Sequence, residues 1–229
     1  MGPRERMMPL YEYRRRARRN LEGNWLQAIL VTITVALVGG YTLVPIVRVT
    51  ADFQAWLAAP TTVPAFDELF YIDLLTIRSA LFWLLGAAAV LGECNCYLQN
   101  AKGSKFLWRN LPLLYREIIK AIALRFLRTV IVCGGLILFI IPGVYFYYQY
   151  AAAPWLLAER PSLSVLEAMA RSRLLMKGKK ARMFLLDLSF AGWLLGAICT
   201  LGLGLLYVIP YHHAARAAFY VKIKNDDQH

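Results

Sequence analysis

The chain has 229 residues, of which 59% are hydrophobic, and it carries a formal net charge of +12. Soluble domains are usually about 45–50% apolar, and the excess here lies in runs that hold no charge at 23–47, 129–158 and 188–215, with a single acid in 79–101. About 20 apolar residues cross a bilayer as a helix, so four such runs leave little room for a separate soluble domain that could present a groove to nucleic acid.

The distribution of Lys and Arg predicts which connections face the cytoplasm, because an excess of these residues near a span marks that side. Residues 1–23 hold seven arginines and are expected to form a basic cytoplasmic segment. The first span, residues 25–47, then runs outward to an external loop at 48–73, which has four acids and one basic residue. The second span, residues 79–98, returns inward and is rich in alanine and glycine, which lets neighbouring helices approach closely.

The next uncharged run is too long and too broken for one span. As a single helix its 30 residues would measure about 45 Å, against a hydrocarbon core of about 30 Å, and Pro142 and Gly143 interrupt it. The segments before and after it are both basic, so an even number of crossings is expected between them. We therefore predict a hairpin that goes out over 118–141 and returns over 144–157, the return arm being either a full span or a re-entrant arm.

The final apolar run predicts another hairpin. One helix is expected over 183–201 and a return helix over 203–222, joined by a turn that contains Gly202 and Gly204. Pro210 lies inside the return helix, where it removes one backbone hydrogen bond. Basic residues follow, which places the C-terminus on the same side as the other basic segments.

An amphipathic helix is expected between the last two hairpins, at 162–177. Ser164 and Glu167 fit a capping box that would begin it, and Gly178 would end it. Its apolar and basic residues recur at helical spacing, which is typical of a helix that lies on the inner leaflet and attracts anionic lipids. The alternative is an ordinary solvated connector.

Together these segments predict the fold class. The chain is expected to be all-α and polytopic, a single integral membrane domain over residues 1–229. It would contain about six transmembrane helices in three hairpins, plus the cytoplasmic interfacial amphipathic helix. Both termini are expected in the cytoplasm.

Short motifs in the segment from Ile141 to Tyr220 resemble a known bacterial family. They are Ile-Pro-Gly at 141–143, Met-Lys-Gly at 176–178, F-L-L-D-L-S-F at 184–190 and T-L-G-L-G at 200–204, and the opening segment at 17–25 is similar too. With these motifs the chain resembles a family of small multi-pass bacterial membrane proteins that is catalogued only as a domain of unknown function. The resemblance implies a location in the bacterial cytoplasmic membrane and carries over no activity, substrate or catalytic residue.

Ionisable residues inside the predicted spans form the candidate site. Such residues are costly in a membrane and mark either a functional site or a structural pair. All of them fall in the cytoplasmic half of the predicted spans: Glu93, Arg125, Arg128, Asp187, His212, His213 and Arg216. One interpretation is that each acid pairs with an arginine and holds the helices together. The other is that they surround a polar cavity that opens to the inner leaflet, with a polar notch at Pro210.

Small residues recur at every fourth position of the fifth predicted helix, at Gly192, Gly196 and Thr200. This spacing indicates close helix packing, within the chain rather than between copies. Cys94 and Cys96 are separated by one residue, whereas structural zinc ligands usually have two or more residues between them. No metal site and no cofactor is therefore predicted. The sequence also lacks the common hydrolase, zinc-protease and nucleotide-binding motifs, which argues against an enzyme.

Two functions fit this sequence. The first is the binding or transport of a lipid or small amphiphile through an inner-leaflet polar cavity. The second is a structural or regulatory membrane subunit that acts through a protein partner. A third, a membrane-embedded lipid-modifying enzyme, would use His212 or His213 with Asp187. The expected partners are lipids of the anionic inner leaflet and, for the second function, a protein, but not nucleic acid.

Overall fold

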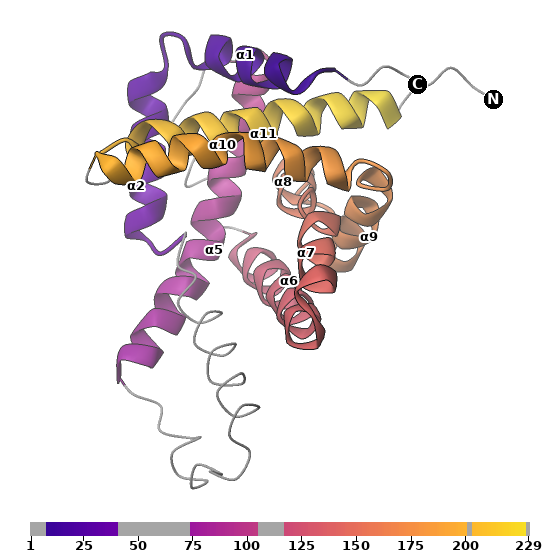
Figure 1. Ribbon diagram of the computed structural model, residues 1–229. Helices are drawn as coiled ribbons and strands as arrows, with labels where there is room; N and C mark the ends of the chain where they lie inside the picture. The colour runs from indigo at the N-terminus through magenta and orange to yellow at the C-terminus, as the bar shows by residue number, and fades with distance from the viewer. Residues whose placement is uncertain (1–7, 41–73, 105–116, 201–202, 228–229) are drawn as a thin grey trace, which may run out of the picture.

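The computed structural model describes residues 8–40, 74–104, 117–200 and 203–227, and the regular structure in these ranges is entirely helical (Figure 1). The all-α prediction is therefore confirmed for this part of the chain. The helices, in chain order, are α1 (Leu10–Leu21), α2 (Trp25–Leu37), α5 (Leu74–Ala101), α6 (Ile118–Leu138), α7 (Ile140–Gln149), α8 (Ala153–Glu159), α9 (Val165–Leu175), α10 (Lys180–Cys199) and α11 (Leu205–Asp227).

The basic N-terminal segment contains a packed helix, α1, that the sequence analysis did not anticipate. Tyr13, Ala17 and Leu21 lie four residues apart and are fully buried, which is the apolar stripe of an amphipathic helix. The ring of Tyr13 lies 5.3 Å from that of Phe219, centroid to centroid, so α1 packs on α11. Its arginines remain on the opposite face.

Helices α2 and α5 approach each other backbone to backbone. A Cβ atom at Gly86 would lie 2.6 Å from the nitrogen of Gly40, so only glycine fits there. Gly39 has φ +83°, a conformation that glycine adopts without strain, and it ends α2. The remainder of the predicted first span and the external loop fall on residues 41–73, which lie outside the described residues.

Helices α6 and α7 form the predicted hairpin, but its turn comes earlier than expected. The backbone leaves helical geometry at Phe139, with φ −162° and ψ 154°. Pro142 and Gly143, predicted as the break, instead lie in the first turn of α7. Proline is tolerated in a first helical turn because its missing N–H would have no partner there. Gly143 is needed for packing, since a Cβ atom at Gly135 of α6 would lie 2.9 Å from its Cα atom.

The return arm predicted at 144–157 is two short helices. Helix α7 ends at Gln149 and α8 begins at Ala153, with a turn between them. The ten residues of α7 measure about 15 Å, about half the thickness of a hydrocarbon core. The arm is therefore not one continuous span in the structure.

The helix predicted at 162–177 is present as α9. The Oγ atom of Ser164 accepts a hydrogen bond from the Glu167 backbone N–H at 3.2 Å, and Glu167 Oε2 accepts one from the Ser164 backbone N–H at 2.9 Å. These two bonds are the predicted capping box. Gly178 adopts φ +73° in the turn that follows the helix.

Helices α10 and α11 form the last hairpin, and Figure 1 shows this pair running across α2 and α5 rather than alongside them. At the turn, a Cβ atom at Gly204 would lie 2.8 Å from the Cα atom of Ala197. The Gly204 backbone N–H also donates to the hydroxyl of Thr200 at 2.9 Å. Gly202 lies outside the described residues. Pro210 is buried inside α11.

The stripe of small residues on α10 is only partly packed. A Cβ atom at Gly192 or Gly196 would meet no atom of the described residues within 4 Å. The close contact in this region lies at the turn, where a Cβ atom at Gly204 would meet Ala197 and Thr200, and a groove lies beside the rest of the stripe.

Among the described residues, one helix is long and apolar enough to cross a membrane by its length and composition. This helix is α6, and only 17% of its apolar window is buried inside the protein. Helix α2 is apolar as well, but its described part is shorter.

The glycine contact between α6 and α7 can be tested with neighbouring substitutions. Gly135→Ala should lower the thermal stability of the purified protein, because the new methyl group would overlap α7 and overpacking typically costs about 1–3 kcal/mol. Gly134→Ala is the matched control: a Cβ atom there meets no atom of the described part of the chain within 4 Å, and alanine favours a helix over glycine by about 1 kcal/mol. A Gly135→Ala protein that melts no lower than the control would contradict this packing.

Candidate functional site

The carboxylate of Asp187 on α10 is the centre of a polar network. Its Oδ1 atom accepts hydrogen bonds from Arg216 Nε at 2.9 Å, and it lies 2.8 Å from His212 Nε2. Its Oδ2 atom is bonded to Arg216 Nη2 and accepts a hydrogen bond from the hydroxyl of Tyr148 at 3.0 Å. The arginine therefore binds the carboxylate through two nitrogens, which is the strongest form of this ion pair. The network joins α10, α11 and α7.

The network continues through aromatic rings to α6. Arg216 Nη2 donates to the hydroxyl of Tyr147 at 3.3 Å. The guanidinium carbon of Arg128 lies 4.8 Å from the centroid of the Tyr147 ring, which is a cation–π contact. Tyr147 therefore contacts two arginines, one paired with Asp187 and one on α6.

The second acid, Glu93 on α5, is fully buried. Its Oε1 atom lies 3.8 Å from Nδ1 of His213 on α11, and the His213 ring stacks on Tyr97 with centroids 5.8 Å apart. This contact joins α5 to α11. Both acids predicted as candidates are thus in contact with α11, one through an arginine and a histidine and the other through a histidine.

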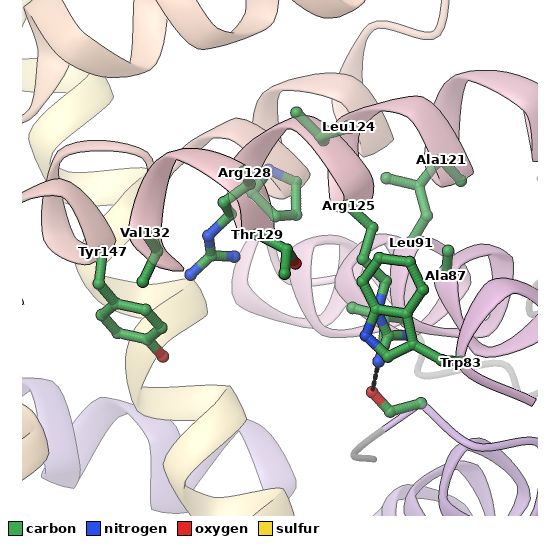
Figure 2. A pocket seen from close by; sticks show the side chains of 13 residues that line it. Trp83, Ala87, Leu91, Ala121, Leu124, Arg125, Arg128, Thr129, Val132 and Tyr147 are labelled. Carbon is green, nitrogen blue, oxygen red and sulfur yellow. Dashed lines mark hydrogen bonds between the residues drawn. The ribbon is translucent and has the colours of Figure 1, made fainter. Parts of the chain in front are cut away.

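A cavity of about 370 Å³ lies beside this network (Figure 2). Arg125 and Arg128 extend into it from α6, with Trp83 beside the first and Tyr147 beyond the second. Its remaining walls are mostly apolar, and no carboxylate occurs among the described residues that line it. These are Gly40, Trp83, Ala87, Val90, Leu91, Ala121, Leu124, Arg125, Arg128, Thr129, Val132, Tyr147 and Pro154.

Only some of the hydrogen-bond donors of Arg125 have a partner among the described residues. Its Nη2 atom donates to the carbonyl oxygen of Gly40 at 3.0 Å, and its guanidinium carbon lies 4.9 Å from the Trp83 ring centroid. Its Nη1 atom is buried and has no hydrogen-bond partner among the described residues. A buried donor without a partner costs about 1–3 kcal/mol, and more when it is charged. The cavity therefore offers hydrogen-bond donors and positive charge to an anion.

The structure divides the seven predicted residues into three groups. Asp187, His212 and Arg216 form one, Glu93 and His213 form another, and the two arginines of α6 line the cavity. The sequence analysis missed Tyr147 and Tyr148, although both lie in the aromatic run that follows Gly143. The feature of the sequence that could have identified these two tyrosines is the phenol group, which usually finds a hydrogen-bond partner when it is buried.

A second polar junction lies at the end of α8. Glu159 Oε1 accepts from the ammonium groups of Lys102 and Lys224, each at 2.6 Å, and Glu159 Oε2 accepts from the hydroxyl of Tyr220 at 2.7 Å. Burial raises the pKa of this carboxyl, but the hydrogen bonds from the two lysines and the tyrosine outweigh burial and lower the pKa to about 2. The junction ties the ends of α5, α8 and α11 together.

Further contacts join basic residues to backbone carbonyl groups at segment ends. They are Lys120 with Pro161 at 2.7 Å, Lys179 with Ile223 at 3.1 Å, and Arg182 with Met8 at 3.4 Å. These contacts join the start of α6 to the segment between α8 and α9, and the start of α10 to the end of α11 and to the N-terminal region. The charge distribution predicts a common side for all of these segments.

A family model matches the C-terminal half of the chain. Residues 114–227 match the model described as "Protein of unknown function (DUF975)". No curated protein and no solved structure matches the chain. The matched region runs from α6 to α11, so it includes both cavity arginines and the Asp187 network, whereas Glu93 on α5 precedes it.

The Asp187 network predicts a clear loss of stability when its charge is removed. Asp187→Asn should lower the thermal stability of the purified protein, because it leaves Arg216 charged and without its carboxylate, and breaking a buried ion pair typically costs about 3–5 kcal/mol. Asp227→Asn, an exposed site on α11, removes the same charge and should have little effect. Equal melting temperatures for the two variants would show that the pair contributes no stability.

The Glu159 junction predicts that the stability of the protein falls at acidic pH. Its folded-state pKa of about 2 is below the ordinary value of 4.5, so its stabilisation is present above pH 4.5 and is lost as the pH falls from there toward 2. Glu159→Gln should melt lower than wild type at pH 7 and lose less stability on acidification. Glu22→Gln, at an exposed carboxyl, should follow wild type. Parallel curves for all three proteins would contradict this role.

Proposed function

We propose that this chain, which belongs to the DUF975 family of proteins of unknown function, is a multi-pass protein of the bacterial cytoplasmic membrane that binds a small amphiphile with an anionic head group. The amphiphile would occupy the cavity that Arg125 and Arg128 line, with its head group on the two guanidinium groups and its apolar part against the surrounding walls. This proposal specifies the first of the two functions that the sequence allows.

The exposed surface supports a membrane location. On α6, the side chains of Ile119, Phe126 and Val130 are more than half exposed, and they lie on a different face from the arginines. Large apolar side chains are also exposed on other helices: Leu26 and Leu37 on α2, Ile140 and Ile141 on α7, and Leu188 and Trp193 on α10. Large exposed apolar surfaces are uncommon on soluble monomers, whereas lipid would cover these side chains without cost.

The contacts among basic segments support the proposed topology. Lys102, Glu159 and Lys224 meet in one junction, although they come from three different connections in the chain. If each connection lies on the cytoplasmic side, as the excess of Lys and Arg predicts, the apolar segments between them cross the membrane an even number of times or enter and return. Both termini would then be cytoplasmic.

The charge imbalance of the cavity is the observation that carries the proposal. Two guanidinium groups face a mostly apolar space, and the described lining supplies them with no carboxylate. Within hydrocarbon, unpaired charge is expensive and marks a functional site by default. An anionic head group would neutralise it and would give the Nη1 atom of Arg125 a hydrogen-bond acceptor. The volume of about 370 Å³ falls within the range of small-molecule sites.

The Asp187 network has a supporting part in this proposal. Because Asp187 binds Arg216 through two nitrogens, its charge is already neutralised, so it is poorly suited to attract a ligand. Arg216 in turn holds the hydroxyl of Tyr147, whose ring forms the end of the cavity beside Arg128. The network therefore positions one cavity wall and is not itself the ligand site.

Binding can be tested with amphiphiles that share a tail and differ in the head group. Dodecyl phosphate and dodecanoate should raise the melting temperature of the protein in nanodiscs, and dodecyl maltoside, which is uncharged, should not. The Arg125→Gln/Arg128→Gln variant should lose this response, because each charge-assisted hydrogen bond contributes about 1.5–3 kcal/mol. Arg171→Gln removes an exposed arginine outside the cavity and should respond like wild type.

Native mass spectrometry of protein released from bacterial membranes provides the second measurement. Wild type and Arg171→Gln should carry a defined adduct that the folded double variant lacks, and the adduct mass would identify the amphiphile. An equal response of the double variant to dodecyl phosphate would overturn the proposal. So would the absence of any adduct and any response in wild type, which would favour a structural or regulatory subunit.

A further inference from the structure

A second, open groove lies between α6, α7 and α9. Its volume is about 770 Å³, and it shares no lining residue with the cavity described above. One wall is apolar, with Leu127 and Ile131 of α6 and Met169 of α9, and the aromatic side chains of Tyr145 and Tyr150 lie along it. The rim of the groove also carries basic side chains.

The basic rim is formed by three residues, Arg173, Lys177 and Lys180. No carboxylate occurs among the described residues that line the groove. The stretch from 168 to 186 contains six basic residues and no acid, and Lys179 and Arg182 already bind backbone carbonyl groups elsewhere. The positive charge of the rim is therefore not balanced within the groove.

Lys180 is held in position within the groove. Its Nζ atom donates to Gln149 Oε1 at 2.9 Å and lies 3.4 Å from the centroid of the Tyr145 ring. An ammonium group has three donors, so these two contacts leave one for an anion. Arg173 and Lys177 lie four residues apart on the exposed side of α9 and of the turn after it, so they face the same side.

The polarity of the groove matches that of a phospholipid. Leu166 and Leu174 of α9 are each 70% exposed, so they would insert among acyl chains at the edge of the groove. The apolar wall belongs to α6, the helix that is long and apolar enough to cross a membrane. A bound lipid would place its acyl chains along Leu127 and Ile131 and its phosphate among the three basic residues.

We infer that this groove is a binding site for a phospholipid with a net negative head group. Three cations without a carboxylate favour an anionic head over a zwitterionic one, as in the basic lipid pockets found between transmembrane helices. The inference rests on the membrane location proposed above, but not on anion binding in the cavity, which uses other residues. The lipid would fix α9 on the inner leaflet and cover the open side of α6.

The test compares retained lipids on the purified full-length protein. Wild type is equilibrated in micelles with equal amounts of phosphatidylglycerol and phosphatidylcholine and is then analysed by native mass spectrometry. It should retain phosphatidylglycerol in preference to phosphatidylcholine. The Arg173→Gln/Lys177→Gln/Lys180→Gln variant should bind phosphatidylglycerol on the order of a hundredfold more weakly, since each basic residue near an anionic lipid contributes several-fold.

The control removes the same charge elsewhere. Arg15→Gln/Arg16→Gln/Arg19→Gln changes three exposed arginines of α1 and should retain phosphatidylglycerol like wild type. Equal retention by the groove variant, or an equal loss in the α1 variant, would overturn the inference. Full displacement of the lipid by glycerol phosphate, which has no acyl chain, would do so too, because it would show a simple anion site.

Two measurements keep the test informative if the triple variant folds poorly. Lys177→Gln alone changes an exposed side chain and should weaken retention several-fold; unchanged retention would contradict the inference. The thermal response to dodecyl phosphate, which depends on Arg125 and Arg128, should persist in the groove variants. A groove variant that keeps this response and loses phosphatidylglycerol separates the two sites.

Discussion

The ion pair between Asp187 and Arg216 is the contact on which the arrangement of the C-terminal helices depends. A carboxylate inside an apolar helix pair is tolerated only when its oxygens are bonded, and here Arg216, His212 and Tyr148 bond both of them. Because these partners come from α11 and α7, the charge requirement fixes three helices relative to one another. The rotation of α7 that brings Tyr148 to the carboxylate also places Tyr147 in contact with two arginines.

Close backbone contacts, together with the polar groups, hold the helices against one another. Glycines allow α2 to meet α5 at Gly86 and α6 to meet α7 at Gly143, and the Glu159 junction joins the end of α5 to the ends of α8 and α11. Packing of this kind suits a membrane, where small residues and interhelical hydrogen bonds replace the hydrophobic effect as the source of helix association. The exposed apolar faces then remain available to lipid.

Much of the helical framework could be predicted from the sequence, because long apolar runs and a capping box are local signals. The box at Ser164 and Glu167 is present as predicted. The turn between α6 and α7 was misplaced because Pro142 and Gly143 are usual helix breakers, whereas their role here depends on where α6 approaches α7. No local pattern marks Phe139 as the turn. The packing of α6 against α7 determines the position of the turn.

The candidate site, like the helical framework, could be predicted from the sequence only in part. The ionisable residues could be found from the sequence because charge is rare in apolar segments, and their depth suggested that some would meet. Which of them pair could not be read from spacing. Asp187 meets Arg216 across a hairpin, whereas the arginines of α6 meet no carboxylate in the cavity lining. Partner choice depends on the rotation of each helix about its axis, which the sequence leaves undetermined.

Helix α6 contributes to two separate sites. One face carries Arg125 and Arg128 into the cavity, and another face lines the groove with Leu127 and Ile131. Because only a small share of the apolar window of α6 is buried inside the protein, much of its surface is left for other molecules. Under the two proposals, a lipid in the groove and an anion in the cavity would contact the same helix on different faces, so α6 is the element that the two sites share.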